Sequence, residues 1–503
     1  MTSSNLRSRF RRGEIAILLI ALIGFAVPGF AGQTPAVTGD WTGTLTAGEQ
    51  RLRIVLHVAS SDTGALQVSA DSVDQGAFGL EGVDAVMNGA HFRFVIPSVR
   101  GRYEGTLSAD GETLTGTWTQ TAPLPLDFVR IGATHGFLPY AAVALAVIAA
   151  FVALWFFEEK IVRTVRAWPV LPVYVAVAPL LLTCVLMAAG YLYEKSGEAR
   201  DAQKYPPLGK LVDVGGHKLQ LYCIGSGAPT VIIETGMGTP SYLWVPVQNG
   251  VANFTRVCTY DRAGYGWSEL SPRPLSMADR VAELHTLLAN AHVDGPYVLV
   301  GHSYGGALVR LYAHDCPDRV AGMVLVDAAE ESFATEPSIA EFRRAYVQTL
   351  KTRTRESQFG IVRFGLRKGD PLTEAAFSSP RYWAETHDEA RSILAMPEQM
   401  AGLEQPGTLG NLPLIVIRRG ESTNEKIPGI SSQEIDQKWQ EAQTLLSKLS
   451  ANSDLVVATS SGHNIEMSQP DLIVSEISRV VQSVRHNVPL NASSGGSGHC
   501  CAR

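Results

Sequence analysis

The chain has 503 residues, and at about one domain per 150 residues this length predicts several folding units rather than one. Its 42 Lys and Arg against 48 Asp and Glu give a net charge of −6. No basic stretch beyond the first dozen residues is dense enough to follow a phosphate backbone, which argues against nucleic-acid binding. With 46% apolar residues and six cysteines but no CxxC pair or HExxH motif, the chain is neither disordered nor a disulfide scaffold, and no zinc site is expected.

The N-terminus has the pattern of a secretory signal. Four arginines between positions 7 and 12 precede an uncharged run at 15–27, which is followed by the small or helix-breaking residues Pro28, Gly29 and Ala31. We therefore expect residues 1–31 to be a signal peptide that is cleaved after Ala31. An uncleaved anchor is the alternative, although the run is shorter than the roughly 20 apolar residues that span a bilayer. In both cases the segment after Ala31 would be exported.

Residues 37–131 alternate apolar and polar residues in short runs separated by Gly, Asp and Ser. This pattern predicts an all-β domain. The similar sequences GDWTGTL at Gly39 and GRYEGTL at Gly101 indicate hairpin edges that recur in a small antiparallel barrel or sandwich. The segment resembles the lipocalin-like β-domain found ahead of some secreted bacterial serine hydrolases. Binding of an apolar substrate or a partner, and a purely structural role, both stay open.

Two further segments, 136–157 and 170–193, carry no charge. Each is long enough to cross the ~30 Å hydrocarbon core at 1.5 Å per residue, so we expect two transmembrane helices, with a buried soluble hairpin as the alternative. The intervening loop, 158–167, has an excess of basic residues, which favours the cytoplasmic side. The β-domain and the C-terminal domain would then both lie on the periplasmic side of a bacterial inner membrane.

After a polar linker at 194–207, strand-like and helix-like segments alternate over residues 208–488. This order predicts an α/β fold, a mostly parallel sheet with helices on both faces. The expected strands are KLQLYCIG, TVIIET, RVCTYD, YVLVGHS, MVLVDA, LIVIRR and DLVVAT. Residues 330–410 interrupt them with helix-like sequence, which we interpret as a cap over the site. Its aromatic residues would either line the substrate site or form the core of the cap.

One of these strands leads directly into a nucleophile motif. Tyr297–Val300 is followed by Gly-His-Ser-Tyr-Gly-Gly and then by a helix-like segment. This strand, turn and helix context is what a GxSxG elbow requires, and it identifies Ser303 as the candidate nucleophile. The glycines allow strand and helix to approach closely around a strained turn. The alternative is an ordinary glycine turn without a catalytic role.

A serine hydroxyl needs an adjacent base, which is itself oriented by a carboxylate. His463, in the loop after the last expected strand, is the candidate base. Asp327 ends the strand MVLV and is the preferred acid, although an aspartate there could merely cap the next helix. Glu421, which lies after the next strand, is the alternative acid. The α/β-hydrolase chain order of serine, acid and histidine fits either choice.

An oxyanion needs two backbone donors near the nucleophile. The amide of Tyr304, directly after Ser303, is the first candidate. The second is the amide of Met237, in the Gly-Met-Gly loop after TVIIET. The side chain of Met237 would be left to line the acyl pocket.

Five segments together resemble the bacterial α/β-hydrolase superfamily, in its secreted or membrane-tethered branch. They are CIGSGAPTVIIETGMG, RVCTYDRAGYGWS, GPYVLVGHSYGG, AGMVLVDAAEE and SGHNIEMSQP. The resemblance implies hydrolysis of an ester, thioester or amide through an acyl-enzyme, without a cofactor or a metal. The chain departs from the common pattern by lacking an aspartate soon after LIVIRR and by having Thr235-Gly236 where His-Gly is usual. Asp261 and Arg262 match a family motif that we interpret as structural.

In that fold the second and fourth strands are neighbours, and they carry Cys223 and Cys258. A cross-strand disulfide is therefore expected, and an exported location favours it over two buried thiols. Cys500 and Cys501 lie in a Gly/Ser-rich segment, 489–503, that we expect to be a flexible tail without an assigned role.

The sequence thus predicts a membrane-anchored carboxylesterase-like or lipase-like serine hydrolase. Ser303 would attack the acyl carbonyl of a small-molecule substrate, His463 would transfer the proton and Asp327 would orient His463. Two alternatives are an acyltransferase that uses the same three residues and a non-catalytic binding protein built on the same fold.

Overall fold

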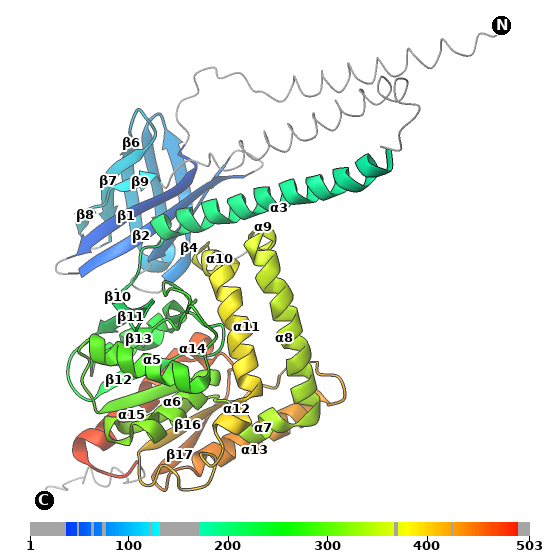
Figure 1. Cartoon of the computed structure of the whole chain (residues 1–503). Coiled ribbons are helices and arrows are strands. Elements are labelled where there is room, and N and C mark those ends of the chain that lie inside the picture. Colours follow the sequence, from blue (N-terminus) through cyan, green and yellow to red (C-terminus); the bar gives the residue numbers. More distant parts are fainter. Residues whose placement is uncertain are drawn as a thin grey trace, which may run out of the picture.

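A computed structural model of the chain describes residues 37–47, 50–61, 65–72, 77–120, 122–130, 171–366, 371–423 and 426–490. The predicted signal peptide, the predicted span at 136–157 and all but the first two residues of the predicted tail lie outside these ranges. Figure 1 shows a β-barrel, an α/β domain and the long helix α3 that runs between the barrel and the helical cap.

The barrel is a nine-stranded antiparallel sheet that closes on itself. Its order is β6-β5-β4-β3-β2-β1-β9-β7-β8, and the extra pairing of β6 with β7 closes the sheet into a barrel. The strands are β1 Gly39–Ala47, β2 Gln50–Ser60, β3 Leu66–Ser72, β4 Ala77–Asn88, β5 His91–Ile96, β6 Gly101–Leu107, β7 Thr113–Thr119, β8 Pro123–Pro125 and β9 Phe128–Arg130. The all-β prediction is confirmed, and closure removes the exposed sheet edges that would otherwise pair with other chains.

The alternation of apolar residues in the barrel strands directs aromatic and aliphatic side chains inward. Leu56 and Val58 are buried in this core together with Phe94, Tyr103 and Phe128. The ring of Tyr103 lies 5.4 Å from that of Phe94 and 5.2 Å from that of Phe128. Such offset or edge contacts between rings stabilise a core beyond the area that they bury.

Helix α3, Leu171–Lys204, extends beyond the range that the sequence predicts. The expectation of a polar linker at 194–207 is wrong, because the helix continues for about three turns after the apolar run. No proline interrupts residues 194–204, and Glu194 is held by an ion pair with Arg363 of the cap, 2.8 Å away. Within the described ranges, no helix combines the length and the apolar character needed to cross a bilayer, so the transmembrane prediction at 170–193 is not confirmed.

The end of α3 contacts the barrel through a cluster of charged groups. Lys204 Nζ lies 2.7 Å from Asp40 Oδ2. The ring of His57 lies between two carboxylates, with Nδ1 2.8 Å from Asp40 Oδ1 and Nε2 2.9 Å from Asp71 Oδ2. Beside this interdomain cluster, Val55 faces away from the barrel core and is buried against the α/β domain. Charged and apolar contacts together fix where the barrel sits.

The α/β domain is built on an eight-stranded sheet of order β10-β11-β13-β12-β14-β15-β16-β17. Its strands are β10 Lys210–Asp213, β11 Lys218–Ile224, β12 Thr230–Glu234, β13 Val257–Tyr260, β14 Tyr297–His302, β15 Val320–Val326, β16 Leu414–Arg419 and β17 Ser453–Ala458. The pairings from β13 to β17 are parallel, whereas β11 is antiparallel to both of its neighbours. The sequence predicts seven of these strands, and β10 is an addition.

Helices cover both faces of this sheet (Figure 1). Helices α5 Met277–Asn290, α6 Tyr304–Asp315 and α13 Ser432–Ser447 contribute leucines to the core on one face. Helices α4 Val245–Ala252 and α15 Pro470–His486 contribute valines and isoleucines to the core on the other. The short helix α14, Ile465–Ser468, precedes α15. Two buried cores around one sheet are the α/β architecture that the alternating pattern predicts.

The cap occupies the connection between β15 and β16. It consists of α7 Glu331–Thr335, α8 Pro337–Gln358, α9 Ile361–Gly365, α10 Pro371–Ser378, α11 Pro380–Leu394 and α12 Met396–Gln399. Helices α8 and α11 pack side by side and extend toward α3 (Figure 1).

The predicted disulfide between Cys223 and Cys258 is present, with a sulfur–sulfur distance of 2.07 Å. The two residues face each other in the antiparallel pairing of β11 with β13. The bond therefore joins β11, near the edge of the sheet, to the strand that leads into Asp261 and Arg262.

The interdomain cluster makes the stability of the barrel contact depend on pH. Burial lowers the pKa of His57, but its hydrogen bonds to Asp40 and Asp71 outweigh burial and raise the pKa above 6.5. A pKa that is raised on folding gives stabilisation that is complete below the unfolded-state value and is lost as the pH rises through the folded-state value.

We expect the melting temperature of wild type to be several degrees above that of His57→Gln at pH 6, and most of this difference to be lost by pH 9. For a domain of the size of the barrel, 1 kcal/mol shifts the Tm by about 4–8 °C. Differential scanning calorimetry over this pH range measures the difference. A difference in Tm that stays constant at all pH values would contradict the raised pKa of His57.

Candidate active site

The backbone at Ser303 forms a sharp turn between β14 and α6. Ser303 has φ +50° and ψ −120°, a conformation that costs energy for a residue with a side chain. Two glycines make room for it. A Cβ on Gly301 would lie 2.7 Å from the carbonyl oxygen of Gly305, and a Cβ on Gly305 would collide with the carbonyl oxygens of Glu234 and Thr235. The strand and the helix can approach this closely only because both positions lack a side chain.

Three side chains from separate parts of the sequence meet at the carboxyl edge of the sheet. Ser303 follows β14, Asp327 follows β15 and His463 lies in the loop after β17. His463 Nε2 lies 3.0 Å from Ser303 Oγ, and His463 Nδ1 lies 2.7 Å from Asp327 Oδ2. In this chain of hydrogen bonds the imidazole is placed to accept the hydroxyl proton on one side while the carboxylate holds its other nitrogen.

Asp327 is fully buried and has φ +39°, in the left-handed region that non-glycine residues seldom adopt. Its Oδ1 accepts hydrogen bonds from the amide of Arg419 at 2.9 Å and from the indole Nε1 of Trp439 at 2.8 Å. Burial would raise the pKa of Asp327, but the hydrogen bond with His463 and the charge of Arg419 hold it below its usual value. The carboxyl is therefore ionised at neutral pH.

Glu421, the alternative acid, lies elsewhere. Its side chain is exposed, and its amide donates to the carbonyl oxygen of Ser461 at 3.0 Å. Among the hydrogen bonds of the described residues, none joins its carboxylate to His463. Thr423 and Ile427, which follow it in the chain, line the cavity at Ser303, whereas Glu421 does not.

His302 precedes the nucleophile, but its ring does not reach Ser303 Oγ. Its Nε2 lies 3.0 Å from the carbonyl oxygen of His463. Burial lowers the pKa of His302, so the neutral ring donates this hydrogen bond. His302 thus holds the backbone of the loop that carries His463.

Met237 and Tyr304 both border the cavity at Ser303. A Cβ on Gly236 would lie 3.3 Å from the Cβ of Ser303, so the loop that carries Met237 passes beside the nucleophile. No hydrogen bond made by the described residues uses the amide of Met237 or of Tyr304. The two amides are thus available as a pair of donors next to Ser303. Thr235, which stands where His is usual, donates from Oγ1 to the carbonyl oxygen of Thr239 at 2.7 Å and folds the loop.

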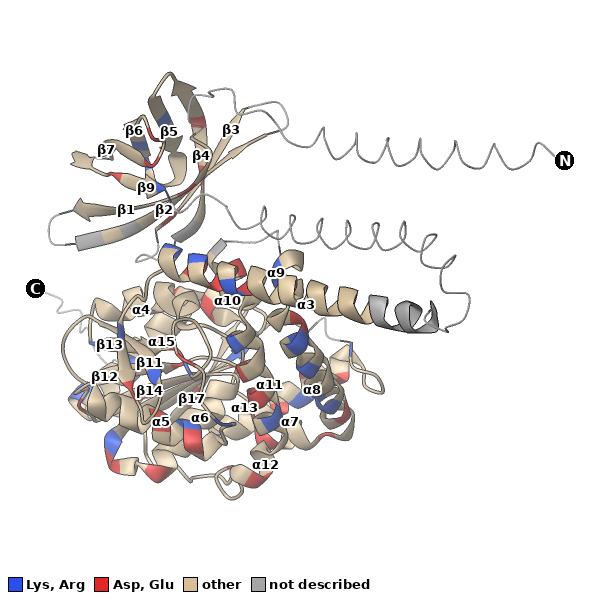
Figure 2. Ribbon diagram, turned by 45° about the horizontal axis from the view of Figure 1, so that its top comes forward, with Lys and Arg blue, Asp and Glu red and all other residues tan. Residues whose placement is uncertain are grey.

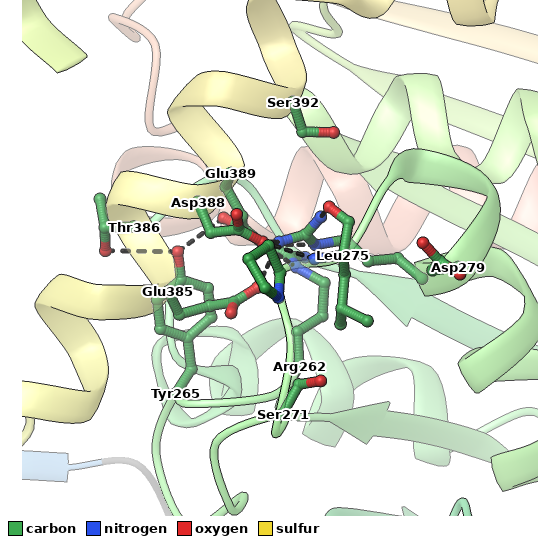
Figure 3. A network of polar contacts seen from close by, with 12 residues as sticks. Arg262, Tyr265, Ser271, Leu275, Asp279, Glu385, Thr386, Asp388, Glu389 and Ser392 are labelled. Atoms are coloured by element: carbon green, nitrogen blue, oxygen red, sulfur yellow. Dashed lines mark hydrogen bonds and ion pairs between the residues drawn. The ribbon is translucent and has the colours of Figure 1, made fainter.

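A buried network of charged groups lies beneath this loop (Figure 3). Arg262 lies between Glu234 of the sheet and Glu389 of cap helix α11, with nitrogen–oxygen distances of 2.5 Å to each. From the sequence motif, Arg262 is interpreted only as a structural residue. Its partner Glu389 lies 127 positions further along the chain, and no local pattern marks such a pairing.

The cavity in front of Ser303 has a volume of about 400 Å³. Cap residues Phe342 and Tyr346 line it, along with Ile339 and Ile393. Other cap aromatics pack on one another, with the ring of Tyr382 lying 4.6 Å from Phe377 and 5.2 Å from Trp383. The aromatic residues of the cap therefore divide between the two uses that the sequence leaves open.

No group of three or more His, Cys, Asp or Glu side chains that could hold a metal ion is found in the part of the chain that the structure describes. The chemistry that this arrangement supports is proton transfer at a serine hydroxyl, next to two backbone donors.

The chain is similar to several known proteins. Residues 231–476 match the family model of the alpha/beta hydrolase family. The uncharacterized protein YqjL of Bacillus subtilis is 30% identical over 249 residues, which cover 50% of this chain and 82% of that protein. An AB hydrolase superfamily protein of Gibberella zeae is 26% identical over 294 residues, 51% of this chain and 87% of that protein. A thermophilic esterase from Thermogutta terrifontis has 20% sequence identity and a TM-score of 0.42, covering 55% of this chain and 98% of that structure.

The two acid candidates give a direct test. Asp327→Asn should lower kcat for ester hydrolysis on the order of 10⁴-fold, because the amide favours the wrong tautomer of the histidine that it contacts. Glu421→Gln should stay within about twofold of wild type, as surface substitutions usually do. Steady-state kinetics of the three proteins, with circular dichroism to confirm folding, measures both. Full turnover by Asp327→Asn would show that Asp327 is not the acid that orients His463.

Proposed function

The chain belongs to the alpha/beta hydrolase family, and on that premise we propose that it is a serine hydrolase that cleaves a carboxylic ester through an acyl-enzyme. The observation that carries the proposal is the continuous hydrogen-bonded series from Ser303 through His463 to Asp327. A residue series of this geometry is recognised by its distances and roles rather than by its position in the chain.

In the proposed reaction, Ser303 Oγ attacks the acyl carbonyl while its proton passes to His463 Nε2. The carbonyl oxygen becomes negatively charged, and the amides of Met237 and Tyr304 donate hydrogen bonds to it. His463 then gives the proton to the leaving alcohol, and an acyl group stays on Ser303. A water molecule, deprotonated by His463, attacks this ester, and His463 returns the proton to Ser303 Oγ as the acid leaves.

The walls of the cavity support an apolar acyl group. Phe342, Ile339, Ile393 and the side chain of Met237 present hydrocarbon to it. Burial of each methylene in such a site contributes about 0.8 kcal/mol. Esters with a hydrocarbon acyl chain are thus better candidate substrates than strongly polar ones.

We further propose that the chain is anchored to a membrane, with the barrel and the hydrolase domain on the exported side. The supporting surface is the apolar part of α3, where Leu180, Leu181 and Leu186 are each more than half exposed. Figure 2 shows that charged residues on α3 are confined to the half nearer the barrel. The disulfide between Cys223 and Cys258 supports an exported location, because such bonds persist in oxidising compartments.

The nucleophile is tested by p-nitrophenyl butyrate hydrolysis and fluorophosphonate labelling of the detergent-purified full chain beside Ser303→Ala. Wild type should turn over and label, whereas the variant should lose at least about 10³-fold in kcat and all labelling. Wild type that labels without turnover would favour acyl transfer, which added alcohol acceptors would reveal. A wild type that does neither would favour the binding-protein alternative.

The location is tested by two fusions to alkaline phosphatase, which is active only outside the cytoplasm. A fusion after Arg503 should be active in cells, and a matched fusion after Ala167 should be inactive. An inactive fusion after Arg503 would overturn the exported location, provided that immunoblotting shows equal amounts of the two proteins.

A further inference from the structure

The buried guanidinium of Arg262 contacts the loop that carries the proposed oxyanion donor. One terminal nitrogen, Nη1, donates to the carbonyl oxygen of Thr235 at 2.7 Å. The other, Nη2, donates to the carbonyl oxygen of Gly236 at 2.7 Å. Two successive carbonyls are thus held by one planar group, whose fixed fork suits paired acceptors.

The second of these hydrogen bonds determines the direction of the amide of Met237. The carbonyl of Gly236 and the N–H of Met237 belong to the same peptide unit, which is planar and trans. Any rotation of that unit turns both groups together. By holding the oxygen of Gly236, Arg262 therefore aims the N–H of Met237 away from the network and toward the opposite side of the loop.

Tyr265 holds the same loop one peptide further on. Its hydroxyl accepts a hydrogen bond from the amide of Gly238 at 3.0 Å and donates to Glu389 Oε2 at 2.6 Å. The amide of Gly238 shares a peptide unit with the carbonyl of Met237. Both peptide units that flank the α-carbon of Met237 are thus fixed.

Glu389 of the cap is common to both connections. Its carboxylate contacts Arg262 through Oε1 at 2.5 Å and Oε2 at 3.2 Å, and it accepts the hydrogen bond from Tyr265 (Figure 3). Glu389 is fully buried, as are Arg262 and Glu234. A buried guanidinium that loses one of its two carboxylate partners is left partly uncompensated and shifts toward other acceptors. The position of the loop therefore depends on a cap residue that is remote from it in sequence.

We infer that Glu389 is a positioning residue for the oxyanion donor of Met237 and acts through Arg262 and Tyr265. This inference rests on the proposed function, since it concerns the transition state of acyl transfer at Ser303. It makes the cap part of the catalytic apparatus and not only a cover that selects substrates.

The test compares Glu389→Gln and Tyr265→Phe with a matched control, Glu385→Gln. Glu385 lies one turn earlier on α11, is also buried, and contacts Arg280 at 2.6 Å, with no described hydrogen bond to residues 235–238. Glu385→Gln therefore matches Glu389→Gln in removing one buried carboxylate that pairs with an arginine. All three variants remove a polar contact beneath the site. Only Glu389→Gln and Tyr265→Phe change the groups that hold the loop, because Arg262 and Tyr265 contact it and Glu389 contacts both of them.

The readouts are kcat and KM for p-nitrophenyl butyrate and the inhibition constant of an alkyl trifluoromethyl ketone, whose adduct with a serine carries an oxyanion. Complete removal of an oxyanion donor costs roughly 10²–10³-fold in kcat, so misdirection of one should cost on the order of 10-fold. We expect this loss in kcat for Glu389→Gln and Tyr265→Phe, with KM nearly unchanged and the inhibition constant raised by a similar factor. Glu385→Gln should keep all three constants near wild type.

Two results would overturn the inference: equal effects of Glu389→Gln and Glu385→Gln, or a change confined to KM. If Glu389→Gln does not fold, as thermal melting would show, Tyr265→Phe carries the test alone, because it deletes a single oxygen. A wild type without esterase activity or labelling would instead refute the proposed function, so the two failures are distinguishable.

Discussion

The carboxylate of Asp327 accepts hydrogen bonds from three separate elements, and the arrangement of the site depends on it. The imidazole of His463, the amide of Arg419 and the indole of Trp439 all converge on its two oxygens. A buried carboxylate requires such donors, because an ionised group in a low-dielectric environment is costly unless it is satisfied. The requirement ties the loop after β17 to the ends of β15 and β16, and so places His463 beside Ser303.

The cap and the sheet are joined by a second buried set of charges. Arg262 and Arg280 both contact carboxylates of α11. Buried ion pairs of this kind add little net stability compared with well-packed apolar groups, but breaking one is costly. They favour one position of the cap strongly over nearby ones. A cap held in this way is better suited to geometric precision than to wide opening.

Much of the α/β domain could be predicted because its signals are local. Seven strands, the turn at Ser303 and the loop at His463 each follow from a few neighbouring residues whose spacing allows one structure. The disulfide between Cys223 and Cys258 follows once the strand order of the fold is known. The structure also places Asp327 rather than Glu421 next to His463, a choice that the sequence left open.

The remaining features depend on contacts between distant residues, which no local pattern encodes. Residues 194–204 have the composition of a linker, yet they are helical because Arg363 and the barrel hold them. In the sequence, Trp439 is an ordinary apolar residue of an amphipathic helix. Only the fold brings its indole next to Asp327. Glu389 likewise has no signal in its own neighbourhood. Such positions become recognisable only through the partner that tertiary structure supplies.

Helix α3 has a consequence for how this protein can be divided or recombined. At 1.5 Å per residue its 34 residues form a rod about 50 Å long. Arg363 of the cap binds Glu194 and Asp201 on this rod, at 2.8 and 2.6 Å, and the barrel binds its last residue, Lys204. The barrel and the cap are therefore both held in position by contacts with the same helix. A graft that exchanged the barrel for another module would also have to replace the last turns of α3, because Lys204 pairs with the barrel.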